Sequence, residues 1–163
     1  MTTLEQVQRK AQSLRDAFEK VQNNRFYWQK KTRPLLDKTL KQIQESTGLN
    51  WTFQELSDEL VRLVLNDEQG QQIATLAFRL TYKSLVSVDM SYYSLTYQPD
   101  AKSETFLNIY SLEPGLVDES LIYSSVTQLM DQLLTEFGPL PVTYKDPRAT
   151  PNTIRIRTNI PKG

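Results

Sequence analysis

Histidine and cysteine are both absent from the 163-residue chain, and glycine occurs only five times. Without cysteine the protein can form no disulfide, no thiolate metal site and no thiol nucleophile. Without histidine it lacks the side chain that most often serves as general base, zinc ligand and pH switch. Serine–histidine–aspartate and cysteine–histidine catalysis are therefore excluded, and a metal site would need the oxygen ligands that calcium and magnesium prefer.

Long apolar runs and glycine-rich loops are missing too. The glycines at positions 48, 70, 115, 138 and 163 stand singly at expected turns or ends, so no phosphate-binding loop is present. The most apolar run, residues 60–65, is short and contains Arg62, whereas a membrane span needs roughly 20 apolar residues. The N-terminal stretch has no apolar segment typical of a signal peptide. We therefore expect a cytoplasmic protein with no membrane partner, no cofactor and no enzymatic activity.

The 19 basic and 19 acidic residues cancel, but they are unevenly distributed. Residues 1–47 carry ten basic and five acidic side chains, residues 48–140 carry four and thirteen, and residues 141–163 carry five and one. Two basic arms thus flank an acidic middle. We favour the interpretation that the arms pack on the middle and neutralise it. In the alternative, an arm meets an acidic partner or a nucleic-acid backbone.

The N-terminal arm predicts a helix over residues 3–28. Thr3 and Gln6 have the spacing of a capping box. Apolar residues recur at alternating spacings of three and four, as in a heptad repeat, with one interruption at Arg25. They are Leu4, Val7, Ala11, Leu14, Phe18, Val21 and Trp28. In a parallel homodimer Lys10 and Arg15 would face each other and repel. We favour packing of this stripe on the protein's own sheet or second helix, with packing on another chain as the alternative.

A second helix is expected from about Thr32 to Thr47. Pro34 fits only a first helical turn, and Gly48 is a typical C-terminal cap. Residues 1–48 are therefore expected to form a helical pair, arranged as a hairpin or as one kinked rod.

The middle of the chain, residues 49–115, predicts an antiparallel meander of four or five strands. The expected strands are 51–56, 59–65, 73–82, 86–97 and 105–112. With a loop at residues 83–85, matching of the apolar faces places Leu80 opposite Val88 and Arg79 opposite Asp89. The opposite face is expected to meet water; it holds Thr75, Arg79, Thr81, Ser87, Asp89 and Ser91.

A closing helix is expected within residues 116–138. Asp118 should begin it, and Gly138 and Pro139 should end it. Residues 139–163 read as a proline-rich extended tail, and residues 153–160 alternate as in an edge strand. The fold class is thus α+β, with a single domain over residues 1–140. We expect the helices 3–28 and 118–137 to cover one face of the sheet.

The stretch NNRFYWQKKTRP, residues 23–34, places three consecutive aromatic residues among basic ones. Consecutive residues on a helix point about 100° apart, so the three rings cannot share one face. We favour a structural role, in which Phe26 and Tyr27 would fill the joint between the helices or cover a sheet edge. The alternative is binding of single-stranded nucleic acid by residues 25–41, because aromatic rings stack on bases and basic groups contact phosphates. The candidate partner or nucleic-acid contacts are Arg25, Tyr27, Trp28, Lys30, Lys31, Arg33, Arg155 and Arg157.

The leading hypothesis for function is a non-catalytic protein-interaction or adaptor module, which binds a protein partner or self-associates through its N-terminal helices. Nucleic-acid binding is one alternative. Another is binding of a small molecule in a concave sheet that carries tyrosines; these are Tyr82, Tyr92, Tyr93, Tyr97 and Tyr110.

Overall fold

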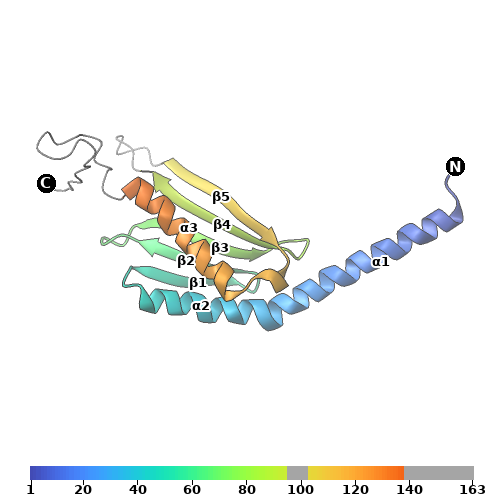
Figure 1. Cartoon of the computed structure of the whole chain (residues 1–163), viewed down its shortest axis with the longest axis horizontal. Helices are drawn as coiled ribbons and strands as arrows, with labels where there is room; N and C mark the ends of the chain where they lie inside the picture. The colour runs from blue at the N-terminus through green and yellow to red at the C-terminus, as the bar shows by residue number, and fades with distance from the viewer. Residues whose placement is uncertain (95–102, 138–163) are drawn as a thin grey trace, which may run out of the picture.

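A computed structural model describes residues 1–94 and 103–137 and confirms the α+β class. Figure 1 shows a five-stranded sheet, two helices packed on it and a long N-terminal helix that projects from one end. The elements in chain order are α1 (Leu4–Tyr27), η1 (Trp28–Thr32), α2 (Arg33–Ser46), β1 (Trp51–Ser57), β2 (Leu60–Asn66), β3 (Gln72–Leu80), β4 (Val86–Ser94), β5 (Ser103–Leu112), η2 (Pro114–Leu116) and α3 (Glu119–Phe137).

The N-terminal helical pair is one bent rod rather than a hairpin. Between α1 and α2 the backbone stays helical but widens to a π-helical turn, in which the Arg33 N–H donates to the Trp28 carbonyl. Pro34 at the start of α2 has no N–H and would crowd the preceding turn of an α-helix. A wider turn relieves this crowding without breaking the helix. Gly48, with φ of +74°, follows the rod where the sequence predicts a cap.

Helix α1 does not pack on the sheet, so the favoured expectation for residues 3–28 is wrong. It begins at the predicted capping box, in which Gln6 N–H donates to Thr3 Oγ1 and Thr3 N–H donates to Gln6 Oε1. None of its 24 residues is buried. The physical reason is the continuous rod: with no loop between α1 and α2, the chain cannot reverse to lay α1 on the sheet (Figure 1).

The sheet is an antiparallel meander in which the strands lie in chain order from β1 to β5. The predicted apolar faces of β3 and β4 are correct, but their pairing is shifted by two residues, so Leu80 lies opposite Val86 and Arg79 opposite Ser87. The shift arises in the hairpin loop. Strand β3 ends at Leu80, and Ser84 adopts a left-handed conformation with φ of +62°. Thr81 N–H then donates to the Leu85 carbonyl at 2.7 Å, closing a loop one residue earlier than expected.

One face of the sheet carries the hydrophobic core beneath α2 and α3. Helix α2 packs against β1 and β2, and α3 packs against β3 and β4. Asp118 Oδ1 accepts a hydrogen bond from Leu121 N–H at 2.8 Å, which confirms it as the start of the closing helix. The largest fully buried side chains are Trp28, Phe78, Leu36, Leu40, Leu63, Leu76, Ile122 and Leu129. It is α2, rather than α1, that shares this face with α3.

The opposite face of the sheet is polar but not fully solvated, contrary to expectation. Thr75, Ser87 and Asp89 are buried. Asn108 from β5 lies across them and donates to Asp89 Oδ1 at 2.7 Å and to Ser87 Oγ at 2.9 Å, while Ser87 Oγ donates to Asp89 at 3.0 Å. The amide of Asn108 therefore lies over Ser87 and Asp89, while Arg79 on the same face is exposed. Among the described residues no helix packs on it.

Candidate interaction site

Trp28 is the centre of the bend between α1 and α2. Its side chain is 1% exposed, and its indole N–H donates to the Asp58 carbonyl at 2.9 Å, in the turn between β1 and β2. Thr32, also buried, donates from its hydroxyl to the Pro114 carbonyl at 3.0 Å. The bend is thus anchored to two segments far away in sequence. Trp28 therefore has the structural role that we favoured for residues 23–34, at the joint between the helices.

Two of the candidate arginines hold the same turn. Arg33 Nη1 donates to the Asp58 carbonyl at 2.7 Å, and its Nη2 lies 3.0 Å from Glu55 Oε2. Arg25 forms an ion pair with Glu59. The side chain of Arg33 is only 14% exposed. This part of the basic arm therefore neutralises acids of the sheet, as the favoured interpretation of the charge distribution predicts.

The remaining candidates in this segment lie at the surface. Phe26 and Tyr27 are 59% and 44% exposed, so the first of the two expectations, that they fill the joint, is wrong. Lys30 places its ammonium group 5.9 Å from the centre of the Phe26 ring. Tyr27 approaches Gly115 in η2, and Lys31 is exposed. The structure does not gather the candidates on one surface, because consecutive side chains diverge around the helix and Trp28 points inward.

Arg155 and Arg157, with the proposed edge strand 153–160, lie outside the described residues, as does Tyr97. The tyrosines in the described ranges are divided between different surfaces, since Tyr92 and Tyr93 are consecutive in β4 and point to opposite faces of the sheet. Tyr92 and Tyr110 lie under α3, where their hydroxyls hydrogen-bond Gln132 and Gln128. Tyr82, expected in β3, stands at the hairpin tip and is 94% exposed.

A shallow hollow of about 300 Å³ occurs on the helix-free face of the sheet. Leu56 and Phe106 border it, and the buried carboxylate of Asp89 lies at its floor with Arg62 nearby. The Arg62 Nε donates to Gln54 Oε1 at 2.6 Å. Arg62 and Asp89 therefore already have partners outside the lining of the hollow: Gln54 for Arg62, and Ser87 and Asn108 for Asp89.

The most exposed apolar surface of the rod is the stripe on α1. The side chains of Leu4, Val7, Leu14 and Phe18 are 72%, 54%, 55% and 59% exposed. Leu14 and its neighbours continue the helix face on which Trp28 is buried, because the spacing of seven keeps them in line. The stripe is thus buried at Trp28, where the rod meets the sheet, and exposed from Leu4 to Phe18.

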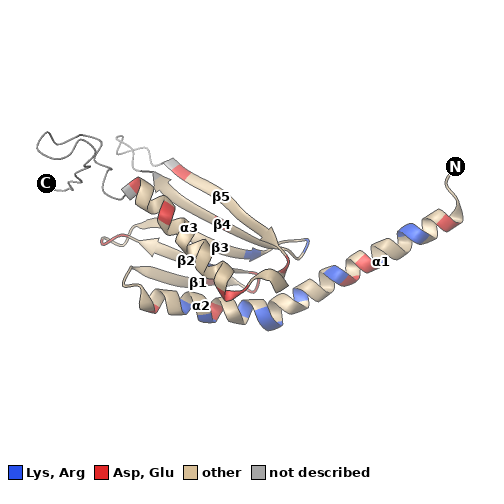
Figure 2. Cartoon of the chain, in the orientation of Figure 1, with Lys and Arg blue, Asp and Glu red and all other residues tan. Residues whose placement is uncertain are grey.

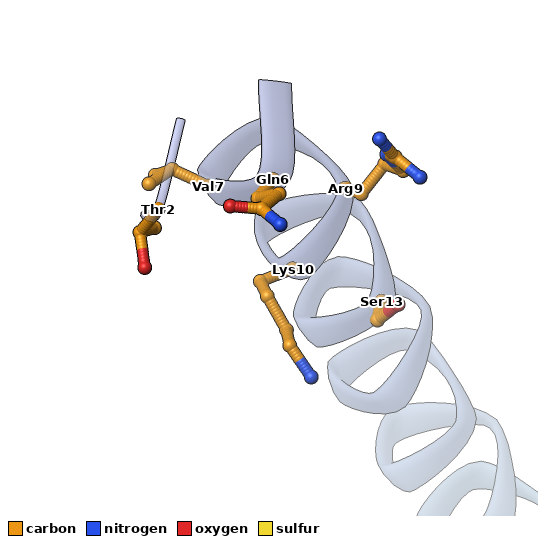
Figure 3. Close-up of a pocket in the computed structure, with 6 residues that line it drawn as sticks. All are labelled: Thr2, Gln6, Val7, Arg9, Lys10 and Ser13. Atoms are coloured by element: carbon orange, nitrogen blue, oxygen red, sulfur yellow. The ribbon is translucent and has the colours of Figure 1, made fainter. Parts of the chain in front are cut away.

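The hollow at the N-terminal end of α1 is lined by side chains of that helix and of Thr2, which precedes it. Figure 3 shows Thr2, Gln6, Val7, Arg9, Lys10 and Ser13 around the first turns, and the described residues that line this hollow all lie between positions 2 and 13. In the described part of the chain, the ion pairs that tie α1 to the body lie in its C-terminal third: Lys20 with Glu113 at 3.0 Å, and Arg25 with Glu59. The region is therefore an open helix surface and not an enclosed pocket.

The heptad spacing predicts the apolar stripe on α1, but its exposure was not the favoured expectation. The available signal was the segment between the two helices, which contains no glycine or other loop-forming run that could reverse the chain.

Comparison of the chain with protein-family models, curated proteins and solved structures found no significant match. Within residues 1–94 and 103–137, no helix is long and apolar enough to cross a membrane. No group of three or more acidic side chains in the same ranges is arranged to hold a metal ion. The exposed position of α1 is therefore the observation on which a functional proposal can rest.

Proposed function

We propose that this chain is a cytoplasmic, non-catalytic protein-interaction module that uses α1 as its docking element and the sheet with α2 and α3 as its folded base. One observation carries the proposal: a helix of 24 residues stands outside the core with none of its residues buried.

The energetics of isolated helices support the proposal. Helices shorter than about 12–15 residues are marginal in water, and even longer ones gain most of their stability from packing an apolar face. Here that face includes Leu14 and Phe18, which are more than half exposed. Burying a leucine or phenylalanine side chain contributes about 1.5–3 kcal/mol. A partner that covers the stripe would therefore gain binding energy and would also stabilise the helix.

The nucleic-acid alternative has less support. Of the three aromatic rings that it invokes, Trp28 is buried, and Phe26 and Tyr27 are exposed but point about 100° apart on the helix. Arg25 and Arg33 are paired with carboxylates. Lys30 and Lys31 remain at the surface, and the ring nearest to Lys30 is that of Phe26.

Site-specific photocrosslinking in the cells that produce the protein tests the proposal. A photoreactive residue replaces Leu14 on the stripe or, as the matched control, Ser13 on the far side of the same turn. We expect a discrete crosslinked species from position 14 and none from position 13. The species should disappear when Phe18 is changed to Asp, because an ionised carboxylate cannot enter an apolar interface.

Equal crosslinking from both positions, or none from either, would refute α1 as the docking element. The mass of the crosslinked species separates a second copy of this chain from a different protein, and both results agree with the proposal. Phe18→Asp should leave the melting temperature of the purified protein unchanged, since the residue contributes nothing to the core.

A further inference from the structure

The charges beside the α1 stripe restrict what can bind to it. In a heptad repeat, the residues that border the apolar stripe form the ion pairs between two helices. On α1 these flanking positions are Gln8, Lys10, Arg15, Ala17, Gln22 and Asn24. Two of them are basic and none is acidic.

The acidic residues of α1 lie on its far side. Glu5 pairs with Arg9 there at 3.4 Å, and Asp16 accepts a hydrogen bond from Gln12 at 2.9 Å. In the described part of the chain, neither Lys10 nor Arg15 forms an ion pair; Arg15 donates only to the neutral Gln12. Figure 2 shows both signs of charge along the projecting helix. The stripe itself is bordered by one sign only.

A second copy of α1 matches this surface poorly. In a parallel pair Lys10 would face Arg15 of the other copy, and in an antiparallel pair each flank would face the same flank of its partner. Because no flanking residue is acidic, neither orientation gives an attractive charge pair. Like charges in these positions disfavour the assembly.

We propose that α1 binds an amphipathic helix of another protein whose apolar stripe is flanked by glutamate or aspartate, so that the two helices form a coiled coil. The inference rests on the proposed function and adds the chemistry of the partner. The helix of 24 residues is about 36 Å long, which accommodates three heptads of a partner helix. Apolar contacts would supply most of the affinity, and the basic flanks would select the partner.

Two designed peptides test this assignment against the full chain. Both have four heptads with isoleucine and leucine in the stripe; one carries glutamate at every flanking position and the other lysine. Their binding is measured by fluorescence anisotropy at 0.05 M and 0.5 M NaCl. We expect the glutamate peptide to bind about tenfold more tightly at low salt. Lys10 and Arg15 attract the glutamate side chains of one peptide and repel the lysine side chains of the other. The preference should shrink at high salt, where exposed charges are screened.

A pair of matched variants locates the effect. Arg15→Glu changes a flanking residue, and Arg9→Glu makes the same charge change on the far side. We expect Arg15→Glu to remove most of the preference for the glutamate peptide, and Arg9→Glu to change it less than about twofold. Neither residue is buried, so both variants should give the circular dichroism spectrum of the unchanged protein.

Equal binding of the two peptides, or no binding of either, would overturn the inference. A dimer of the chain itself, detected by light scattering and dissociated by Leu14→Asp, would also overturn it. In that last case α1 would still be the docking element, so the proposed function would stand while the acidic partner would not. By contrast, equal or absent crosslinking from positions 13 and 14 would refute both the proposed function and the acidic partner.

Discussion

Replacement of Trp28 by alanine should be among the most damaging single changes in this chain. The side chain is 1% exposed and joins α1, α2 and the turn between β1 and β2. Truncation of a buried tryptophan to alanine costs about 3–5 kcal/mol through lost burial and the cavity left behind. The Asp58 carbonyl also loses the indole donor, a hydrogen bond worth about 1 kcal/mol. We therefore expect a loss of about 4 kcal/mol in the free energy of unfolding.

Urea denaturation followed by far-UV circular dichroism measures this loss. With a slope of about 2 kcal/mol per molar urea, the midpoint should fall by about 2 M. The adjacent Phe26 is a matched control, because it is aromatic but 59% exposed. We expect Phe26→Ala to change the free energy of unfolding by less than about 0.5 kcal/mol. If Phe26→Ala were as costly as Trp28→Ala, the assignment of Trp28 alone to the interior of the bend would be wrong.

Three further predictions concern stability, each measured by urea denaturation. Ser84→Gly should stabilise the protein by about 1 kcal/mol, since Ser84 is buried, has φ of +62°, and its hydroxyl finds no hydrogen-bond partner in the described structure; a lower midpoint would contradict this. Asp89→Ala should cost about 2 kcal/mol because the buried hydroxyl of Ser87 and the amide of Asn108 lose their carboxylate acceptor, and a neutral result would mean that water replaces it. Arg33→Ala should lower the free energy of unfolding by about 1–2 kcal/mol, because Arg33 bonds the Asp58 carbonyl and Glu55 beside the β1–β2 turn, and Lys31→Ala should lower it by less than about 0.5 kcal/mol. Equal losses would mean that these Arg33 contacts do not stabilise the turn.

The element positions were predictable because their patterns are local. Thr3 and Asp118 begin helices as capping residues should, and alternation of apolar residues located β2 to β5 to within a few residues of their ends. Trp28 lies in line with the apolar stripe, which predicted its burial. These signals require only neighbouring residues, and so a single sequence contains them.

The pairing of β3 with β4 could not be predicted to the residue. The register depends on which residue of the hairpin loop adopts a left-handed conformation, and such positions are usually marked by glycine or asparagine. Here Ser84 takes that role and gives no such signal. Whether the α1 stripe is buried or exposed could not be predicted either. An amphipathic helix has the same pattern whether its apolar face packs on its own sheet or on another chain.

The widened turn at η1 also sets the direction in which α1 presents its stripe. A π-helical turn contains one more residue than the α-helical turn that it replaces, and each residue rotates a helix by about 100°. Loss of one residue from Trp28–Thr32 would leave the composition of the stripe unchanged but rotate it about the rod axis relative to the sheet. The number of residues in this turn, and not their hydrophobicity, thus fixes the angular phase between the folded base and anything bound to α1.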